Sequence, residues 1–279
     1  MDRKSSKLAI SHPEGEGVSL VGVLEQLDPG LPTAGRKIAL ILHGTLGHKD
    51  YLFQKRLALN LPLDSFRFDF RGSHESGGHW TYGGLAQDLE DLRIVVAYLA
   101  REYGYEVDLL IGHSRGSVVA FHWLCTSEGR RVGGMVNVSG RYRMDLPKYQ
   151  GSFDDKGFYD WEVTVARKPV VARIYPHDLL EFSKWNTAVV WDQFPLETDV
   201  LTIHGMADQT VPAYDATLYA RALGARTPGT HNLHLMEGAD HNLTGKHEEV
   251  VETILEWWSS RQRRDLRSGI WRTGVRGRL

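Results

Sequence analysis

A serine inside a glycine-flanked turn is the first candidate for chemistry in this chain. Residues 112–116, Gly-His-Ser-Arg-Gly, match the pattern G-x-S-x-G between a run typical of a strand and a run with helical spacing. The small flanking residues let a strand pass into a helix through a very sharp turn, which leaves the hydroxyl exposed at the N-terminus of the helix. We therefore predict that Ser114 is a nucleophile. The alternative is a loop serine that only caps the helix.

A serine hydroxyl becomes a good nucleophile only when a neighbouring base takes its proton. His241, in the sequence Gly-Ala-Asp-His-Asn between the last predicted strand and the last predicted helix, is the candidate base among thirteen histidines. The base needs a carboxylate to orient it, and we predict Asp208, in the loop after the penultimate strand. Asp240 is the alternative acid, although adjacent side chains rarely face each other.

The negative oxygen that forms during acyl transfer needs fixed N–H donors. The backbone N–H of Arg115, directly after the serine, is the first candidate. The second is the N–H of Thr45, in the sequence His-Gly-Thr-Leu-Gly that follows an apolar strand. These glycines allow a substrate to approach the backbone closely. Taken alone, this segment also fits a plain turn at the end of a strand.

Alternating strands and helices must position these residues. The pattern predicts strands at 7–12, 18–27, 37–42, 66–70, 108–111, 132–138, 199–204 and 233–236, and helices at 51–61, 83–101, 117–126, 213–223 and 248–260. The first two strands are separated by a short segment and predict an antiparallel pair. The remaining alternation predicts an α/β fold, with a mostly parallel doubly wound sheet and helices on both faces.

The alternation stops in residues 141–196, which contain eleven aromatic side chains. We predict that this segment is an inserted lid over the carboxyl edge of the sheet, where open α/β sheets bind ligands. Trp161, Trp185 and Trp191 are candidates for stacking against an acyl group, and the alternative is the core of a small cap. The predicted organisation is a core of residues 1–140 and 197–260, the lid of 141–196 and a basic C-terminal tail of 261–279.

The composition excludes several functions. The 279 residues suit one large domain with an insertion, and the longest unbroken apolar run, residues 94–100, is too short to span a membrane. Seven arginines and one aspartate in residues 261–279 leave the rest of the chain acidic, which argues against nucleic-acid binding. We expect this tail to be solvated.

The titratable residues predict no cofactor and no metal. Two pairs, His74-Glu75 and His177-Asp178, lack a third ligand at suitable spacing, and no phosphate-binding loop pattern is present.

The single cysteine, Cys125, excludes an intrachain disulfide and, with the charged N-terminus, favours a cytoplasmic location. A homodimer is a candidate assembly, with one of the two tryptophans at 257–258 as a candidate contact.

The order of these motifs resembles that of the α/β-hydrolase superfamily across about residues 7–260. The motifs are HG-x-x-G at residue 43, G-x-S-x-G at 112, HG-x-x-D at 204 and G-x-D-H at 238, and residues 69–76 look like the D-x-R-G-x-G-x-S segment of many members. The segment around Ser114 and the lid length are similar to serine esterases of the cinnamoyl/feruloyl-esterase type and their intracellular fungal relatives. Thr45, His74 and Arg115 differ from that group's usual residues.

The resemblance and the residues together predict a serine esterase that acts on small-molecule esters with small or aromatic acyl groups through an acyl-enzyme. A thioesterase or a C–C bond hydrolase would use the same three residues. A ligand-binding member of the fold without turnover is the alternative from another class.

Overall fold

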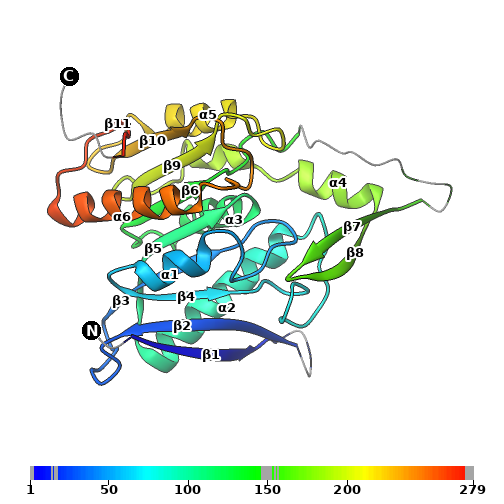
Figure 1. Ribbon diagram of the computed structural model, residues 1–279, viewed down its shortest axis with the longest axis horizontal. Coiled ribbons are helices and arrows are strands. Elements are labelled where there is room, and N and C mark those ends of the chain that lie inside the picture. Colours follow the sequence, from blue (N-terminus) through cyan, green and yellow to red (C-terminus); the bar gives the residue numbers. More distant parts are fainter. Residues whose placement is uncertain are drawn as a thin grey trace.

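A single large sheet forms the centre of the molecule. The computed structural model describes residues 3–13, 15, 18–145, 153, 155 and 157–273. Within these residues the sheet has nine strands in the order β1-β2-β4-β3-β5-β6-β9-β10-β11 (Figure 1). The strands are β1 (Arg3–Ser11), β2 (Ser19–Leu27), β3 (Lys37–Leu42), β4 (Asp64–Phe68), β5 (Glu106–His113), β6 (Gly134–Val138), β9 (Asp199–Gly205), β10 (His231–Met236) and β11 (Gly269–Ile270).

The strand directions confirm the predicted fold class. β1 pairs with β2 and β2 with β4 in antiparallel fashion, whereas each neighbouring pair from β4 to β11 is parallel. In β3, every residue after Lys37 is buried. A strand that is buried on both faces is typical of a parallel sheet between two helical layers. The predicted central strands were found with ends shifted by a few residues.

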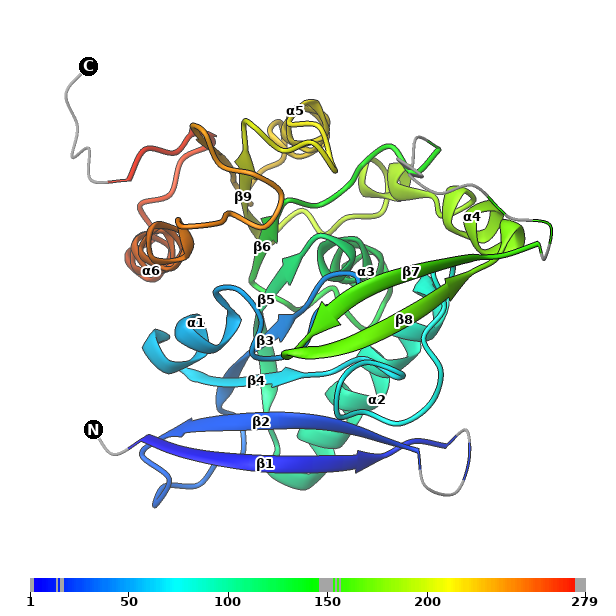
Figure 2. The ribbon, with the colours of Figure 1, turned by 45° about the vertical axis from the view of Figure 1, so that its right-hand side comes forward.

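Helices cover both faces of the sheet. Figure 2 shows α1 and α6 on one face and α2, α3 and α5 on the other. Their bounds are α1 (Gln54–Asn60), α2 (Leu85–Tyr103), α3 (Arg115–Leu124), α5 (Tyr214–Leu223) and α6 (His247–Arg263). Each face has its own apolar cluster, and Trp257 and Trp258 are both buried in the α1/α6 cluster. These tryptophans are therefore not the exposed dimer contact that we considered from the sequence.

No helix within the described residues has the length and apolarity needed to cross the lipid bilayer.

The segment between β6 and β9 contains elements that the sequence pattern did not predict. These are the antiparallel hairpin of β7 (Tyr159–Val165) and β8 (Lys168–Ile174), the helix α4 (Pro176–Ser183) and the 3₁₀ helix η1 (Thr187–Val190). The hairpin turn consists of Ala166 and Arg167, with φ of 48° and 67°. Such a turn usually contains asparagine or glycine, so the sequence carried no ordinary hairpin signal.

We had expected the C-terminal segment to be a solvated tail, but the structure attaches part of it to the sheet. β11 pairs in parallel with β10, and Leu266 and Trp271 pack against the α1/α6 cluster. The N–H of Trp271 donates to the carbonyl of Leu233 at 2.8 Å. Two apolar side chains among the arginines thus attach this segment to the sheet edge. Residues 274–279 of the predicted tail lie outside the described residues.

Candidate active site

Ser114 lies at the sharp junction between β5 and α3. Its backbone has φ 52° and ψ −116°, a conformation that non-glycine residues rarely adopt. The strand and helix approach so closely that a Cβ on Gly116 would lie 2.6 Å from the carbonyl oxygen of His43, and one on Gly112 would lie 2.4 Å from the N of Ser117. The glycines at both positions therefore make the turn sterically accessible.

A continuous hydrogen-bonded series joins Ser114 to two residues from distant loops. Nε2 of His241 lies 2.9 Å from Oγ of Ser114, and its Nδ1 lies 2.8 Å from Oδ2 of Asp208. His241 follows β10 and Asp208 follows β9, so both arrive at the carboxyl edge of the sheet. The structure thus brings the three predicted residues together in the order that proton transfer from a hydroxyl requires.

Asp208 is held in its ionised form. Burial opposes ionisation, but hydrogen bonds from His204 and His241 and the backbone N–H of Val211 keep the pKa of Asp208 well below its usual range. Oδ1 also accepts the N–H of Thr210 at 2.8 Å. The alternative acid differs: Asp240 is exposed, and its Oδ1 accepts the N–H of Thr244.

The two predicted oxyanion donors border the same space as Ser114. Thr45, Arg115 and Ser114 all line one pocket of about 480 Å³. Within the part of the chain that the structure describes, the backbone N–H groups of Thr45 and Arg115 donate to no protein acceptor. Two such N–H groups beside a nucleophile suit the binding of a developing oxyanion.

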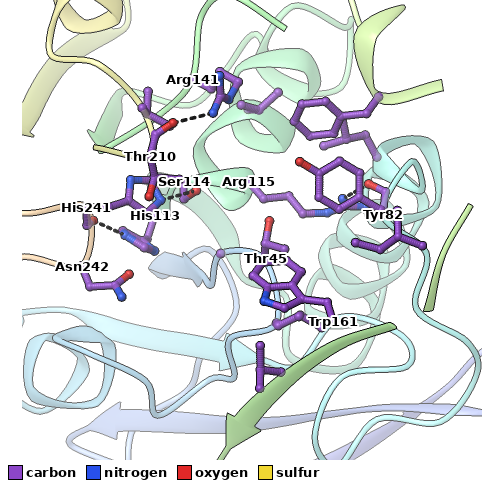
Figure 3. A pocket seen from close by; sticks show the side chains of 18 of the residues that line it. Thr45, Tyr82, His113, Ser114, Arg115, Arg141, Trp161, Thr210, His241 and Asn242 are labelled. Atoms are coloured by element: carbon purple, nitrogen blue, oxygen red, sulfur yellow. Dashed lines mark hydrogen bonds between the residues drawn. The ribbon is translucent and has the colours of Figure 1, made fainter. Parts of the chain in front are cut away.

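The β7–β8 hairpin forms one wall of this pocket. Tyr159, Trp161 and Val163 of β7 and Ile174 of β8 line it. In Figure 3, Arg141 and Thr210 lie above Ser114, and Thr45 and Trp161 lie below. The alternation of Tyr159, Trp161 and Val163 along β7 is the sequence signal that could have identified this wall.

Only one of the three predicted substrate-binding tryptophans borders the pocket. Trp161 lines it, whereas Trp185 and Trp191 do not. The Trp185 ring contacts the His122 ring at a tilted angle, with ring centroids 4.2 Å apart, and Trp191 is 46% exposed and donates to the hydroxyl of Tyr142. The prediction for Trp185 and Trp191 was wrong because the aromatic count gave no information on which face of the segment each side chain occupies.

Comparisons with known proteins identify the architecture. The chain superposes on Est1E from Butyrivibrio proteoclasticus with bound ferulic acid with a TM-score of 0.72 at 17% identity, which covers 92% of this chain and 99% of that one. It superposes on the esterase domain of a Rhodothermus marinus protein with a TM-score of 0.62 at 22% identity, which covers 94% and 99%. The chain has the α/β-hydrolase fold.

Two sequence comparisons agree with this fold. The family model described as serine aminopeptidase S33 matches residues 33–168 of this chain. The putative uncharacterized protein YDL057W of Saccharomyces cerevisiae is 28% identical over 278 residues, which covers 85% of this chain and 76% of the yeast protein. The family match ends before Asp208 and His241. The assignment of these two residues to the site therefore rests on the geometry described above.

The Arg115 side chain anchors the start of α3 in this fold. Its guanidinium forms a buried ion pair with Asp88 of α2 and donates to the carbonyls of Thr81 and Tyr82. The residue that carries one predicted oxyanion donor is therefore fixed by its own side chain. It pairs with a residue of the core helix α2.

Two histidines outside the predicted triad, His43 and His113, support the site. Nε2 of His113 lies 3.0 Å from the carbonyl oxygen of His241, and burial, with the nearby charge of His241, lowers the pKa of His113 to about 3. His113 is therefore neutral at pH 7. Nε2 of His43 accepts the N–H of Phe70, and its Nδ1 lies 2.8 Å from the carbonyl oxygen of Gly44. Both rings thus fix the loops that border Ser114.

One cluster of potential metal ligands lies near the loop that contains Thr45. Ligand atoms of Asp69, His74 and Glu75 lie within 4.8 Å of one another. The ammonium of Lys49 contacts both carboxylates, and hydrogen bonds from Lys49 and Lys7 lower the pKa of Glu75 to about 2. Lys49 thus supplies the positive charge that these carboxylates need. The cluster holds the loop that contains Thr45 against the segment that follows β4.

Proposed function

We propose that this protein is a serine esterase that hydrolyses carboxylic esters through an acyl-enzyme. The observation that carries the proposal is the hydrogen-bonded series from Oγ of Ser114 through the His241 ring to the Asp208 carboxylate, with distances of 2.9 Å and 2.8 Å. A buried carboxylate behind an imidazole fixes its tautomer and stabilises the imidazolium that forms when the ring accepts a proton.

In the first half of the reaction, Oγ of Ser114 attacks the ester carbonyl while Nε2 of His241 takes the hydroxyl proton. The carbonyl oxygen becomes negative and accepts hydrogen bonds from the N–H groups of Thr45 and Arg115. When the tetrahedral intermediate collapses, the C–O bond to the alcohol breaks and His241 gives the proton to the departing oxygen. The acyl group is then bonded to Ser114.

In the second half, water attacks the acyl carbon and transfers a proton to His241. The C–O bond to Ser114 breaks, the proton returns to Oγ, and the carboxylic acid leaves. These steps use side chains of this chain, two backbone N–H groups and water, so the mechanism requires no cofactor.

The side chains that line the pocket favour substrates whose acyl group is small or aromatic. Trp161 presents an aromatic surface, and Phe182, Val118 and Leu85 line the same space. We assign the β7–β8 hairpin the role of a lid, because it borders the pocket that contains Ser114. The solved structures with similar folds include esterases and a ferulic acid complex, which favours an ester over a thioester or a C–C bond.

Kinetics with a panel of three substrate classes test this proposal. We expect measurable turnover of aryl esters, slower turnover of acyl thioesters, and none of vinylogous diketones. Ser114→Ala and His241→Ala should each lower kcat for the best ester by about 10⁴–10⁶-fold, because such residues act as a unit. Faster turnover of thioesters or diketones would contradict the ester assignment, and full activity of Ser114→Ala would contradict the mechanism.

A further inference from the structure

His204 is a fully buried polar residue next to the loop that contains Asp208. It lies near the end of β9, on the same face of the sheet as Val200, which belongs to the apolar cluster against α2, α3 and α5. An apolar side chain is expected at such a position, because a buried polar group needs hydrogen-bond partners. The partners of the His204 imidazole therefore indicate why a histidine is present there.

One ring nitrogen of His204 faces two oxygen atoms of the loop of residues 208–211. Nε2 lies 2.9 Å from the carbonyl oxygen of Val211 and 3.3 Å from Oδ2 of Asp208. Both oxygens are acceptors, so Nε2 carries a proton and donates it to the carbonyl, with the carboxylate as a second, longer acceptor. The other nitrogen, Nδ1, is buried and has no partner in the part of the chain that the structure describes.

The unpartnered Nδ1 makes His204 a costly residue for the core. A buried polar atom without a hydrogen bond destabilises the folded state, and such costs are typical of residues that serve a site. Among the described residues, the hydrogen bonds of this ring therefore connect it only to the loop of Asp208.

The two oxygens of the Asp208 carboxylate have different partners. Oδ1 accepts the N–H groups of Thr210 and Val211, each at 2.8 Å. Oδ2 lies 2.8 Å from Nδ1 of His241 and also faces His204. The hydrogen bond from His204 is one of the contacts that keep the pKa of Asp208 below its usual range. The ring of His204 is therefore a contact that directs Oδ2 independently of His241.

We propose that His204 is a positioning residue that acts through Asp208, because its Nε2–H keeps Oδ2 directed at Nδ1 of His241 during the proton transfers. His241 depends on this acceptor most when it becomes an imidazolium, since the carboxylate then stabilises a full positive charge. His204 does not line the pocket, so it contacts neither the substrate nor the reacting hydroxyl. This inference rests on the proposed esterase function and adds a fourth side chain to the series that begins at Ser114.

Two amide substitutions of His204 test the proposal. Glutamine can place an N–H group where Nε2 lies, whereas the shorter asparagine reaches only the position of Nδ1. His204→Gln should keep kcat for a p-nitrophenyl ester within about fivefold of wild type. His204→Asn should lower kcat by about 10–100-fold with KM unchanged, because misplaced catalytic groups affect the transition state and not substrate binding. Equal kcat values for the two variants, or a loss confined to KM, would overturn the proposal.

A second buried histidine provides the matched control. His231 lies on the neighbouring strand β10, its Nε2 is 2.9 Å from Oγ1 of Thr202, and it does not line the pocket. His231→Asn should lower the urea midpoint without changing kcat per folded molecule. An equal loss of kcat in this control would overturn the proposal. If His204→Asn does not fold, His204→Leu takes its place with the same expected loss, because it buries no unpartnered amide.

A double-mutant cycle tests whether His204 acts through the carboxylate of Asp208. In the Asp208→Asn protein, the further change His204→Asn should alter kcat by less than about twofold, because the carboxylate that His204 positions is already absent. A further loss of about tenfold or more would show that His204 acts by another route, and the proposal would then be wrong.

Failure of this proposal can be distinguished from failure of the proposed function. Ester turnover by the wild-type protein, together with covalent labelling of Ser114 by a fluorophosphonate, tests the esterase function without reference to His204. If both are observed and His204→Gln and His204→Asn have equal kcat, only the positioning role is overturned. If neither is observed, the proposed function is overturned as well.

Discussion

Nε2 of His241 lies 2.9 Å from Oγ of Ser114, although 127 residues separate them in the chain. Parallel strands bring them together, because β5 and β10 end at the same edge of the sheet and each residue follows its strand within a few positions. The Ser114 backbone has a positive φ, which directs the hydroxyl toward that edge. The geometry of the site is therefore a consequence of sheet topology and one strained residue.

The choice between the two candidate acids predicts a clear difference between two matched variants. Asp208→Asn should lower kcat by about 10⁴-fold, because an amide in place of the carboxylate favours the wrong tautomer of His241. Asp240→Asn should remain within a few-fold of wild type, because that carboxylate accepts a hydrogen bond from Thr244 at the surface. Steady-state kinetics on one ester decide between them, and the reverse order of effects would contradict the assignment of Asp208.

The buried pair of Arg115 and Asp88 predicts non-additive effects on stability. Asp88→Asn should lower the free energy of unfolding by about 3–5 kcal/mol, because it leaves the Arg115 guanidinium buried without its carboxylate. The double variant Asp88→Asn with Arg115→Gln should recover part of this loss, since it buries no unpaired charge. Urea denaturation of the four proteins in this cycle measures the coupling. Additive losses would show that the pair is not coupled.

Much of the sheet and of the candidate site was predictable from local patterns. The run Lys37–Leu42 was predicted as a strand with the observed ends, because continuous apolar residues are required where both faces are buried. The serine, histidine and aspartate were predictable because each follows a strand in a motif with a fixed order. The geometric part of that prediction is met, since all three side chains lie in one hydrogen-bonded series.

The remaining features depend on tertiary contacts that local patterns do not encode. The hairpin turn at Ala166-Arg167 has positive φ values without glycine or asparagine, so β7 and β8 were missed. Arg141 lines the pocket because the loop after β6 packs there, and no sequence motif indicates this position. β11 is short and depends on β10 for its pairing, so its sequence resembles that of a solvated tail.

The buried neutral histidines predict that stability falls in mild acid. Burial lowers the pKa of His231 to about 3. In the unfolded chain a histidine takes a proton near pH 6.5, so below that pH the unfolded state binds more protons and the free energy of unfolding decreases as pH falls. His231→Gln should remove up to about 1.4 kcal/mol per pH unit of this dependence between pH 5.5 and 4.5.

Urea denaturation at several pH values measures this slope. Comparison of wild type with His231→Gln cancels the contributions of distant titrating groups. His177→Gln is the control, because that side chain is 72% exposed and meets similar solvent in the folded and unfolded states. Equal slopes in wild type and His231→Gln would contradict the prediction.

Removal of residues 265–279 should affect stability more than catalysis. Leu266 and Trp271 pack against the α1/α6 cluster, so their loss should lower the free energy of unfolding by about 2–4 kcal/mol. None of the described residues after position 264 lines the pocket, so kcat per folded molecule should not change. Thermal denaturation and ester hydrolysis of the shortened protein measure both quantities. A loss of kcat in a folded protein would assign the segment a role at the site.

Covalent labelling by a fluorophosphonate tests the central claim most directly, because the reagent bonds to a serine only when a neighbouring base activates its hydroxyl. Intact-mass and peptide mass spectrometry at pH 7.5 should detect one adduct per wild-type chain, located on Ser114, with no adduct on Ser114→Ala and much slower labelling of His241→Ala. A wild-type protein that is folded and remains unlabelled, or that is labelled at another residue, would contradict the account.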